Sequence, residues 1–316
     1  MTSTHRAQMP TPGSPAPPDS EYPWWVKDAP TWAQPYMLLA RLDRPIGTWL
    51  LLLPCWWGAA LGAMAEGEAL PSLWHVTLFA IGALVMRSAG CAFNDIVDKD
   101  LDAHVARTRS RPVASGQLSR SQALTFSVGL SLIGLVILLQ FNTFTLWLGT
   151  ASVGLVAAYP FMKRITFWPQ AWLGLAFNYG ALVGYSAATG KLAIPALLLY
   201  GAGIAWTLGY DTIYACQDVE DDALIGVKST ARLFGAQAPL WVGRFFALQS
   251  LLLLAAVLGE GAPVLISAIS VSCIALYLAT QSAALRQPNP DYLALFRQHR
   301  GFGVIVFAII CIINFL

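Results

Sequence analysis

Nine long apolar runs follow one another through most of this 316-residue chain, and they constrain its fold more than any other feature. A helix needs roughly 20 apolar residues to cross the hydrocarbon of a bilayer. None of the runs alternates like a strand, and only helices and closed barrels can span lipid. The sequence therefore predicts an all-α polytopic membrane bundle of nine transmembrane helices. The runs lie at about 46–64, 73–93, 121–140, 143–160, 169–188, 194–213, 240–259, 263–281 and 301–316.

The composition excludes several other classes of protein. Hydrophobic residues make up 56% of the chain and charged residues 11%, whereas a soluble domain is about 25% charged. A disordered chain, a coiled coil and a nucleic-acid-binding domain are thereby excluded. The five cysteines have no paired spacing and the four histidines lie far apart, so no Cys/His metal site is expected. We expect the lipid bilayer as surroundings, no nucleic-acid partner and no obligate protein partner.

Residues 1–35 form a separate zone that holds eight of the 19 prolines. The zone has no apolar core like that of a secretory signal, and it is not rich in arginine like a mitochondrial transit peptide. We predict a disordered tail over 1–35, followed by one membrane domain over 36–316. Trp24, Trp25 and Trp32 are expected at the membrane interface, where tryptophan is favoured.

The basic residues predict the orientation of the bundle. Seventeen of the 19 lie before the first run or in the regions of every second loop after it, with Arg244 just inside the seventh run, and the opposite loops hold only Lys191. The remaining one, Arg87, lies inside the second run. Because loops rich in Lys and Arg stay in the cytoplasm, we expect a cytoplasmic N-terminus and a periplasmic C-terminus in a bacterial inner membrane.

Nine of the 17 acidic residues gather in two clusters, each directly after a long apolar run on the predicted cytoplasmic side. Within each cluster, oxygen-bearing side chains recur every four residues. If the helices continue, this spacing stacks the oxygens on one helix face, where like charges repel. A bound divalent cation removes that cost, and carboxylate and amide oxygens suit Mg²⁺. The alternative is a solvated acidic helix end balanced by arginine. The same i, i+4, i+8 ladder occurs twice: Asn94, Asp98 and Asp102, then Tyr214, Asp218 and Asp222.

The two ladders are 120 residues apart and are separated by four runs, so their helices point in the same direction. The second occurrence of the ladder predicts an internal pseudo-repeat. The first four helices would correspond to the next four, and the ninth helix would be an addition.

Four stretches of the sequence resemble one known family. NDxxDxxxD occurs at Asn94–Asp102 and DxxYAxxDxxxD at Asp211–Asp222. Together with RLDRPIGTWLLLLPCWWG (41–58) and YPFMKRITFWPQ (159–170), they resemble the UbiA family of intramembrane aromatic prenyltransferases, and especially its 4-hydroxybenzoate branch. The resemblance covers residues from about 36 to 316. It implies a helical bundle around a central cavity with both Asp-rich motifs on its cytoplasmic side.

The resemblance also implies a reaction. A polyprenyl diphosphate would donate its prenyl group to the ring carbon ortho to the hydroxyl of 4-hydroxybenzoate, giving 3-polyprenyl-4-hydroxybenzoate for ubiquinone biosynthesis. The C–O bond of the donor would break to leave an allylic carbocation, which the ring attacks before it loses a proton. Mg²⁺ ions would bridge the motifs to the diphosphate and neutralise it as it leaves. The implied metal ligands are Asn94, Asp98, Asp102, Asp218 and Asp222.

Five basic residues are candidates for binding substrate by the same resemblance. Arg87 would contact the diphosphate or the aromatic carboxylate, with a salt bridge to a motif aspartate as the alternative. Arg44 would bind the benzoate carboxylate, or would act as an anchor at the cytoplasmic side. Lys163 and Arg164 have the same two readings, with diphosphate as their ligand. Lys228 would position the second motif's loop or contact diphosphate.

Three further residues have implied roles near the reacting atoms. Asp211 and Tyr214 would steady the carbocation, or Asp211 would take the ring proton, and Tyr159 would contact the donor. The arginines of the 107–111 loop have two readings, a lid over the site or a lipid-contacting surface.

Three alternatives stand beside this interpretation. Another branch of the same family would act on dihydroxynaphthoate, homogentisate or haem, because a few pocket side chains decide the acceptor. A transporter usually has its ionisable residues near the membrane midplane, whereas the acidic clusters here lie at the ends of apolar runs, so a transporter is disfavoured. A CDP-alcohol phosphotransferase is disfavoured because its usual aspartate pattern is absent.

Overall fold

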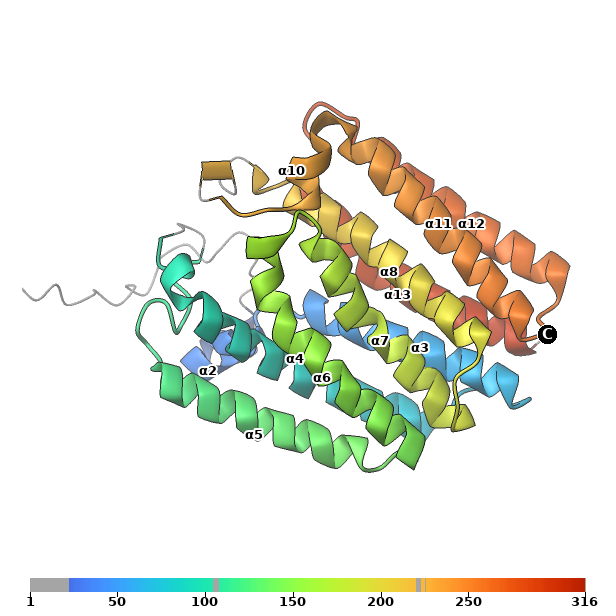
Figure 1. Cartoon of the computed structure of the whole chain (residues 1–316), viewed down its shortest axis with the longest axis horizontal. Coiled ribbons are helices and arrows are strands. Elements are labelled where there is room, and N and C mark those ends of the chain that lie inside the picture. Colours follow the sequence, from blue (N-terminus) through green and yellow to red (C-terminus); the bar gives the residue numbers. More distant parts are fainter. Residues whose placement is uncertain (1–22, 105–107, 220–222, 225, 316) are drawn as a thin grey trace, which may run out of the picture. The chain divides into compact units, whose positions relative to one another are not determined.

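The computed structural model describes residues 23–104, 108–219, 223–224 and 226–315, and this part of the chain is helical without any strand (Figure 1). A long helix covers each of the nine predicted runs within these ranges. They are α3 (Ile46–Ala65), α4 (Leu73–Asp102), α5 (Arg120–Leu138), α6 (Thr143–Ile165), α7 (Pro169–Thr189), α8 (Ile194–Ala215), α11 (Ala238–Gly259), α12 (Val264–Ala284) and α13 (Tyr292–Phe315). The short elements are α1 (Trp24–Lys27), α2 (Gln34–Leu39), α10 (Thr230–Phe234) and the 3₁₀ helix η1 (Gly235–Gln237).

Seven of the described helices are long and apolar enough to cross a membrane, and α7 and α8 are not among them. These two helices are long as well, but Gly, Ala and aromatic residues make up much of their sequences and over half of their residues are buried. Small residues lower the mean hydropathy and let helices pack closely inside a bundle. The multi-pass membrane architecture is therefore supported, while nine spans stay a prediction.

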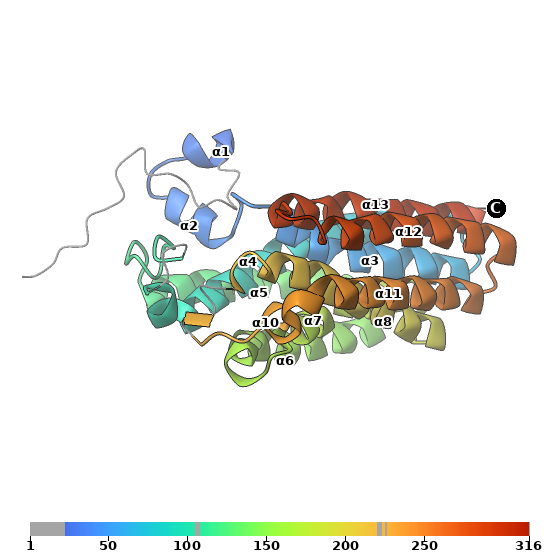
Figure 2. The same ribbon diagram turned by 90° about the horizontal axis from the view of Figure 1, so that it is seen from above.

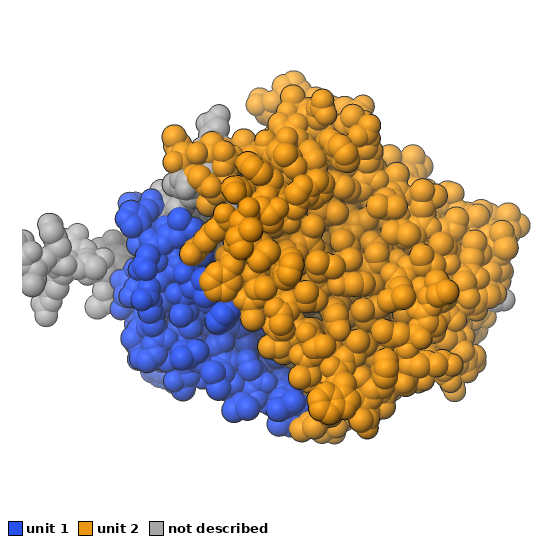
Figure 3. Space-filling model, in the orientation of Figure 1, with its two compact units in different colours: residues 1–47, 84–136 blue, residues 48–83, 137–316 orange. Residues whose placement is uncertain are grey.

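Contacts divide the chain into two compact units, which we describe separately (Figure 3). Unit 1 comprises residues 1–47 and 84–136. Its core joins Leu39 of α2 to Ala92 of α4 and Ala123 of α5, with Tyr36 and Phe126 packed against them. This core packs the C-terminal part of α4, which carries the first acidic motif, against α2 and α5.

Unit 2 comprises residues 48–83 and 137–316. Helix α8 packs against α7, α11 and α13, and α12 lies beside α13 (Figure 2). At its centre the indole of Trp206 donates to Nδ1 of His299 at 2.9 Å, and the indole of Trp57 donates to the carbonyl of Gly303 at 2.8 Å. The two units do not follow the predicted halves of four helices each, so the pseudo-repeat stays a prediction.

The last part of the predicted tail contains helical segments in the structure. Residues 1–22 lie outside the described part, but 23–35 contain α1 and the start of α2. Pro23 precedes α1 and its carbonyl accepts from the backbone of Val26, while the Gln34 side chain donates to the Ala29 carbonyl at 2.9 Å. Local hydrogen bonds thus order a segment whose proline content predicts disorder. Its tryptophans are 44–75% exposed, which suits the predicted interface: Trp24, Trp25 and Trp32.

In unit 2, helices α3 and α7 approach each other along facing glycines, four residues apart on each helix. A Cβ on Gly184 would overlap the backbone carbonyl of Cys55, and one on Gly58 would overlap that of Ala181. Such small-xxx-small patterns let membrane helices come into backbone contact. The glycines are Gly58 and Gly62 on α3 and Gly180 and Gly184 on α7.

We predict that Gly184→Ala destabilises the protein by roughly 1–3 kcal/mol, because the added methyl forces the two backbones apart. The measurement is the thermal unfolding midpoint in detergent. Gly154→Ala on α6 is the matched control, since nothing lies within 4 Å of a Cβ there. Equal midpoints for the two variants would contradict the close packing.

Candidate active site

The first acidic motif lies on the last three turns of α4, which continues unbroken to Asp102. Asp98 is fully buried and Asp102 is 4% exposed, whereas Asp100 on another face is 85% exposed at its side chain. Asn94, Asp98 and Asp102 therefore lie one turn apart on a single continuous helix. Burial makes the repulsion between these carboxylates costly unless a cation is near them.

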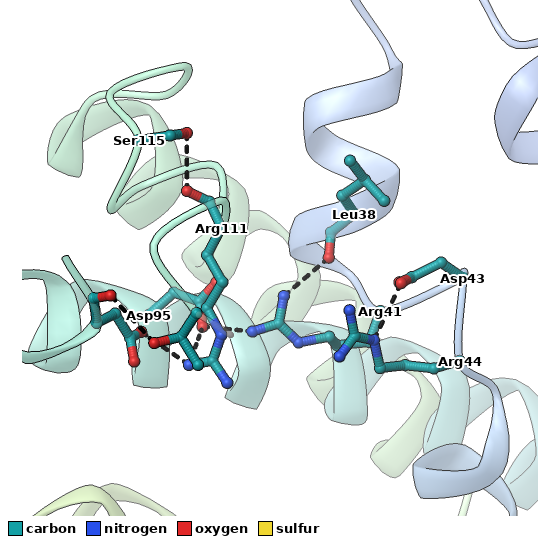
Figure 4. Close-up of polar contacts among 9 residues, drawn as sticks. Leu38, Arg41, Asp43, Arg44, Asp95, Arg111 and Ser115 are labelled. Atoms are coloured by element: carbon teal, nitrogen blue, oxygen red, sulfur yellow. Dashed lines mark hydrogen bonds and ion pairs between the residues drawn. The ribbon is translucent and has the colours of Figure 1, made fainter. Parts of the chain in front are cut away.

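Two arginines of unit 1 supply positive charge to this face (Figure 4). Arg41 donates through Nη2 to Oδ1 of Asp95 at 2.6 Å, and Arg111 donates through Nη1 to Oδ2 of Asp102 at 2.7 Å. Arg111 also lies 3.5 Å from Oδ1 of Asp95. The second oxygen of Asp95 is buried and has no hydrogen-bond partner within the described residues. Asp95 thus connects the two arginines to the acidic motif.

Burial works against the charge of Arg111, but the neighbouring carboxylates outweigh it. Desolvation lowers the pKa of the guanidinium, while Asp95, Asp102 and Asp98 raise it, so the pKa lies above its ordinary value. Arg111 is consequently a permanent cation beside Asp102. The Arg111 side chain therefore pairs with the acidic motif. Neither of the two roles predicted for its loop, a lid or a lipid-contacting surface, involves such a pair.

Arg44 and Arg87, the other candidate residues of unit 1, lie on different elements. Arg44 follows α2 and donates through Nε to Oδ2 of Asp43 at 3.0 Å, and Asp43 is 1% exposed. Arg87 lies two turns before Asn94 on α4, and its guanidinium packs against Gly47 in the first turn of α3.

The second acidic motif differs from the prediction, because α8 ends at Ala215. Cys216 caps the helix, and the backbone N–H of Asp218 turns back to the carbonyl of Ala215 at 3.3 Å. The ladder of Tyr214, Asp218 and Asp222 is therefore not on one continuous helix, and Asp222 lies outside the described residues. The first motif, by contrast, stays helical through four aspartates, so the two motifs differ in local structure despite their equal spacing.

The remaining candidates all belong to unit 2. Asp211 and Tyr214 are half-buried on α8, and the Tyr214 ring lies 4.7 Å from that of Phe296 on α13. Lys228 donates to the carbonyl of Ile165 at 3.1 Å, which places its ammonium at the C-terminal end of α6. That same end carries Tyr159, Lys163 and Arg164, of which Arg164 is exposed and Tyr159 is half-buried. The side chain of Lys163 lies outside the described part.

A buried polar clasp fixes the chain after the second motif. The hydroxyls of Thr212 on α8 and Thr230 on α10 lie 2.6 Å apart, and the Thr230 backbone N–H donates to Gln170 Oε1 on α7 at 3.1 Å. All three side chains are at most 4% exposed. Sequence reasoning did not single them out, although Gln170 ends the quoted YPFMKRITFWPQ stretch. The clasp ties the segment holding Lys228 to the ends of two helices.

The first motif fits a hard divalent cation by its chemistry. Asp98 and Asp102 present buried carboxylates one turn apart, and Asp95 keeps an unpartnered oxygen beside them. Oxygen donors of this kind suit Mg²⁺. Within the described residues, no three His, Cys, Asp or Glu side chains are close enough to share one ion.

Comparison with known sequences gives a consistent result. The model of the UbiA prenyltransferase family matches residues 51–300. The mitochondrial 4-hydroxybenzoate polyprenyltransferase of Bos taurus is 45% identical over 286 residues, which is 89% of this chain and 76% of that protein. The Aedes aegypti protein of the same name is 47% identical over 86% of this chain, and the match spans 62% of its own length.

Solved structures share the fold. A UbiA homologue from Aeropyrum pernix K1 superposes with a TM-score of 0.70 at 26% identity, over 84% of this chain and 97% of that one. A UbiA homologue from Archaeoglobus fulgidus, solved with GPP and Mg²⁺ bound, gives a TM-score of 0.65 at 19% identity, over 87% of this chain and 99% of that one.

Proposed function

Because this chain belongs to the UbiA prenyltransferase family, we propose that it transfers a polyprenyl group from polyprenyl diphosphate to 4-hydroxybenzoate. The product is 3-polyprenyl-4-hydroxybenzoate, a step of ubiquinone biosynthesis. The observation that carries the proposal is the buried carboxylate face of α4 at Asp98 and Asp102. Relatives named as 4-hydroxybenzoate polyprenyltransferases, 44–53% identical to this chain, support the choice of acceptor.

The acidic residues hold the metal in this proposal. Bound Mg²⁺ supplies Lewis-acid neutralisation of the departing diphosphate. Its ligands are Asn94, Asp98 and Asp102 of the first motif with Asp218 and Asp222 of the second. Arg111 balances the charge of Asp102. The GPP and Mg²⁺ in the Archaeoglobus homologue are of the same chemical kind as the ligands proposed.

The basic residues bind the two substrates. Lys163, Arg164 and Lys228 lie on or against the C-terminal end of α6 and bind diphosphate, with Tyr159 beside the donor. Arg44 binds the carboxylate of the acceptor, because a planar guanidinium matches a carboxylate. Arg87 binds that carboxylate or the diphosphate.

The transfer itself breaks the C–O bond to the diphosphate, and both bonding electrons leave with the oxygen. The ring carbon ortho to the phenol hydroxyl then forms the new C–C bond with the allylic carbon. Asp211 accepts the ring proton, and the ring of Tyr214 faces the developing cation.

The membrane arrangement belongs to the same proposal. All nine long helices span the bilayer, with the N-terminus in the cytoplasm, as the distribution of Lys and Arg supports. We assign the protein to a bacterial inner membrane. The relatives described above are mitochondrial proteins, so the mitochondrial membrane is the alternative location.

The proposal predicts prenylated acid when membranes containing the protein receive 4-hydroxybenzoate, a polyprenyl diphosphate and Mg²⁺. EDTA should abolish the product and added Mg²⁺ should restore it, because the diphosphate is then no longer neutralised. Dihydroxynaphthoate, offered in parallel, should give little product. Product from dihydroxynaphthoate alone would contradict the acceptor, and activity in EDTA would contradict the metal.

A further inference from the structure

The guanidinium of Arg87 lies directly against the backbone of Gly47. A Cβ built on Gly47 would be 2.6 Å from Nε, 2.8 Å from Nη2 and 3.0 Å from Cζ of Arg87. Ordinary van der Waals contacts begin at about 3.4 Å. Both residues belong to unit 1, and Gly47 is buried in the first turn of α3. Only a residue without a side chain leaves the guanidinium where it is.

Helix geometry does not require glycine at this position. Gly47 is not among the glycines with a positive φ, and it begins a regular helix. Alanine is the better helix former, because glycine loses more backbone freedom on folding. The glycine therefore serves the contact with Arg87 and not the backbone of α3.

We propose that Gly47 is a positioning residue that sets the place of the Arg87 guanidinium and thereby the binding site for a substrate anion. The inference rests on the proposed function, in which Arg87 binds substrate. Arginine recognises carboxylate and phosphate through a planar fork of N–H donors, so its affinity depends on where that plane lies. The Nε–Nη2 edge of the guanidinium is turned towards Gly47, because Nε and Nη2 lie closer than Cζ to the Cβ position. A side chain at residue 47 would therefore push on the edge that carries two of the donors.

A methyl group at residue 47 would displace the guanidinium by most of an ångström. Binding groups have to be held within about 0.5 Å, and a 1 Å misplacement can lower activity by about 10²-fold. We expect Gly47→Ala to lower kcat/KM by about 10- to 100-fold. The loss should appear mainly as a higher KM for the substrate that Arg87 holds, while the thermal midpoint stays at or above the wild-type value.

Gly129→Ala on α5 is the matched control. Gly129 is also a helical glycine of unit 1, but nothing lies within 4 Å of its Cβ position. This variant should keep wild-type kinetics. A double-mutant cycle then separates positioning from a general effect. In an Arg87→Ala background, adding Gly47→Ala should change kcat/KM by less than about twofold, because the group that it displaces is gone.

The same variants are compared without turnover, by the dissociation constants of 4-hydroxybenzoate and of inorganic pyrophosphate. Gly47→Ala should weaken one of them relative to Gly129→Ala, which also identifies the anion that Arg87 holds. Unchanged dissociation constants, or an effect of Gly47→Ala that persists in full without Arg87, would overturn the inference and leave the proposed function intact. A wild-type protein that forms no prenylated acid would contradict the proposed function, while the binding comparison still decides the role of Gly47.

Discussion

Replacing Asp98 by alanine is expected to lower kcat by about 10³-fold while the protein stays folded. Asp98 is the middle residue of the first motif and is fully buried, so bulk water does not solvate its carboxylate. Its removal takes away a central oxygen ligand and one negative charge from the face that binds the cation. Prenyl transfer by membranes containing the variant, at saturating Mg²⁺ and substrates, measures the effect.

Asp100→Ala is the matched control for this prediction. Asp100 lies on the same helix but is 85% exposed, and its partner Arg120, at 2.9 Å, is exposed as well. Exposed ion pairs contribute little, so this variant should keep activity within about twofold of wild type. If Asp98→Ala were as active as Asp100→Ala, the assignment of the first motif as the metal site would be wrong.

The second large effect is expected on stability, from Asp95→Ala. Asp95 is 1% exposed and forms an ion pair with Arg41, which is itself 9% exposed. Removing one partner of a buried ion pair typically costs about 3–5 kcal/mol, because the other charge is left without compensation. Arg41 also has a φ of 58°, which is rare outside glycine, so this strained backbone loses the contact that holds it. Thermal unfolding in detergent should show a much lower midpoint.

The double variant Asp95→Ala with Arg41→Met should recover much of that loss, because a buried pair replaced by apolar side chains is often close to neutral. A midpoint for Asp95→Ala equal to that of Asp100→Ala would contradict a structural role for the pair. Failure of the double variant to recover would assign the stabilisation to Arg111 instead, which lies 3.5 Å from the same oxygen.

The same sequence periodicity lies on one continuous helix in the first motif and not in the second. Asn94, Asp98 and Asp102 extend a helix whose preceding turns are apolar and packed, so the spacing carries over directly into three dimensions. Tyr214, Asp218 and Asp222 have the same spacing, but α8 ends at Ala215. Because both motifs carry acidic residues at the same spacing, a count of i, i+4, i+8 positions cannot show where a helix ends.

Contacts between residues far apart in the chain could not be predicted from the sequence. Arg41 and Asp95 are 54 residues apart, and no local pattern pairs them. Tertiary packing also produces the contact between Arg87 and Gly47. The same holds for the polar clasp formed by Gln170, Thr212 and Thr230. The long helical segments, by contrast, could be predicted because long apolar runs without strand-like alternation favour helices.

The most direct test of the account uses 4-hydroxybenzoate deuterated at both ring carbons ortho to the hydroxyl, incubated with the membrane-embedded protein, polyprenyl diphosphate and Mg²⁺. Mass spectrometry of the product is the measurement. The account predicts a prenylated acid that has lost one of the two deuterons, formed together with one equivalent of pyrophosphate. A product that retains both deuterons, which marks transfer to oxygen, or the absence of any prenylated acid would contradict it.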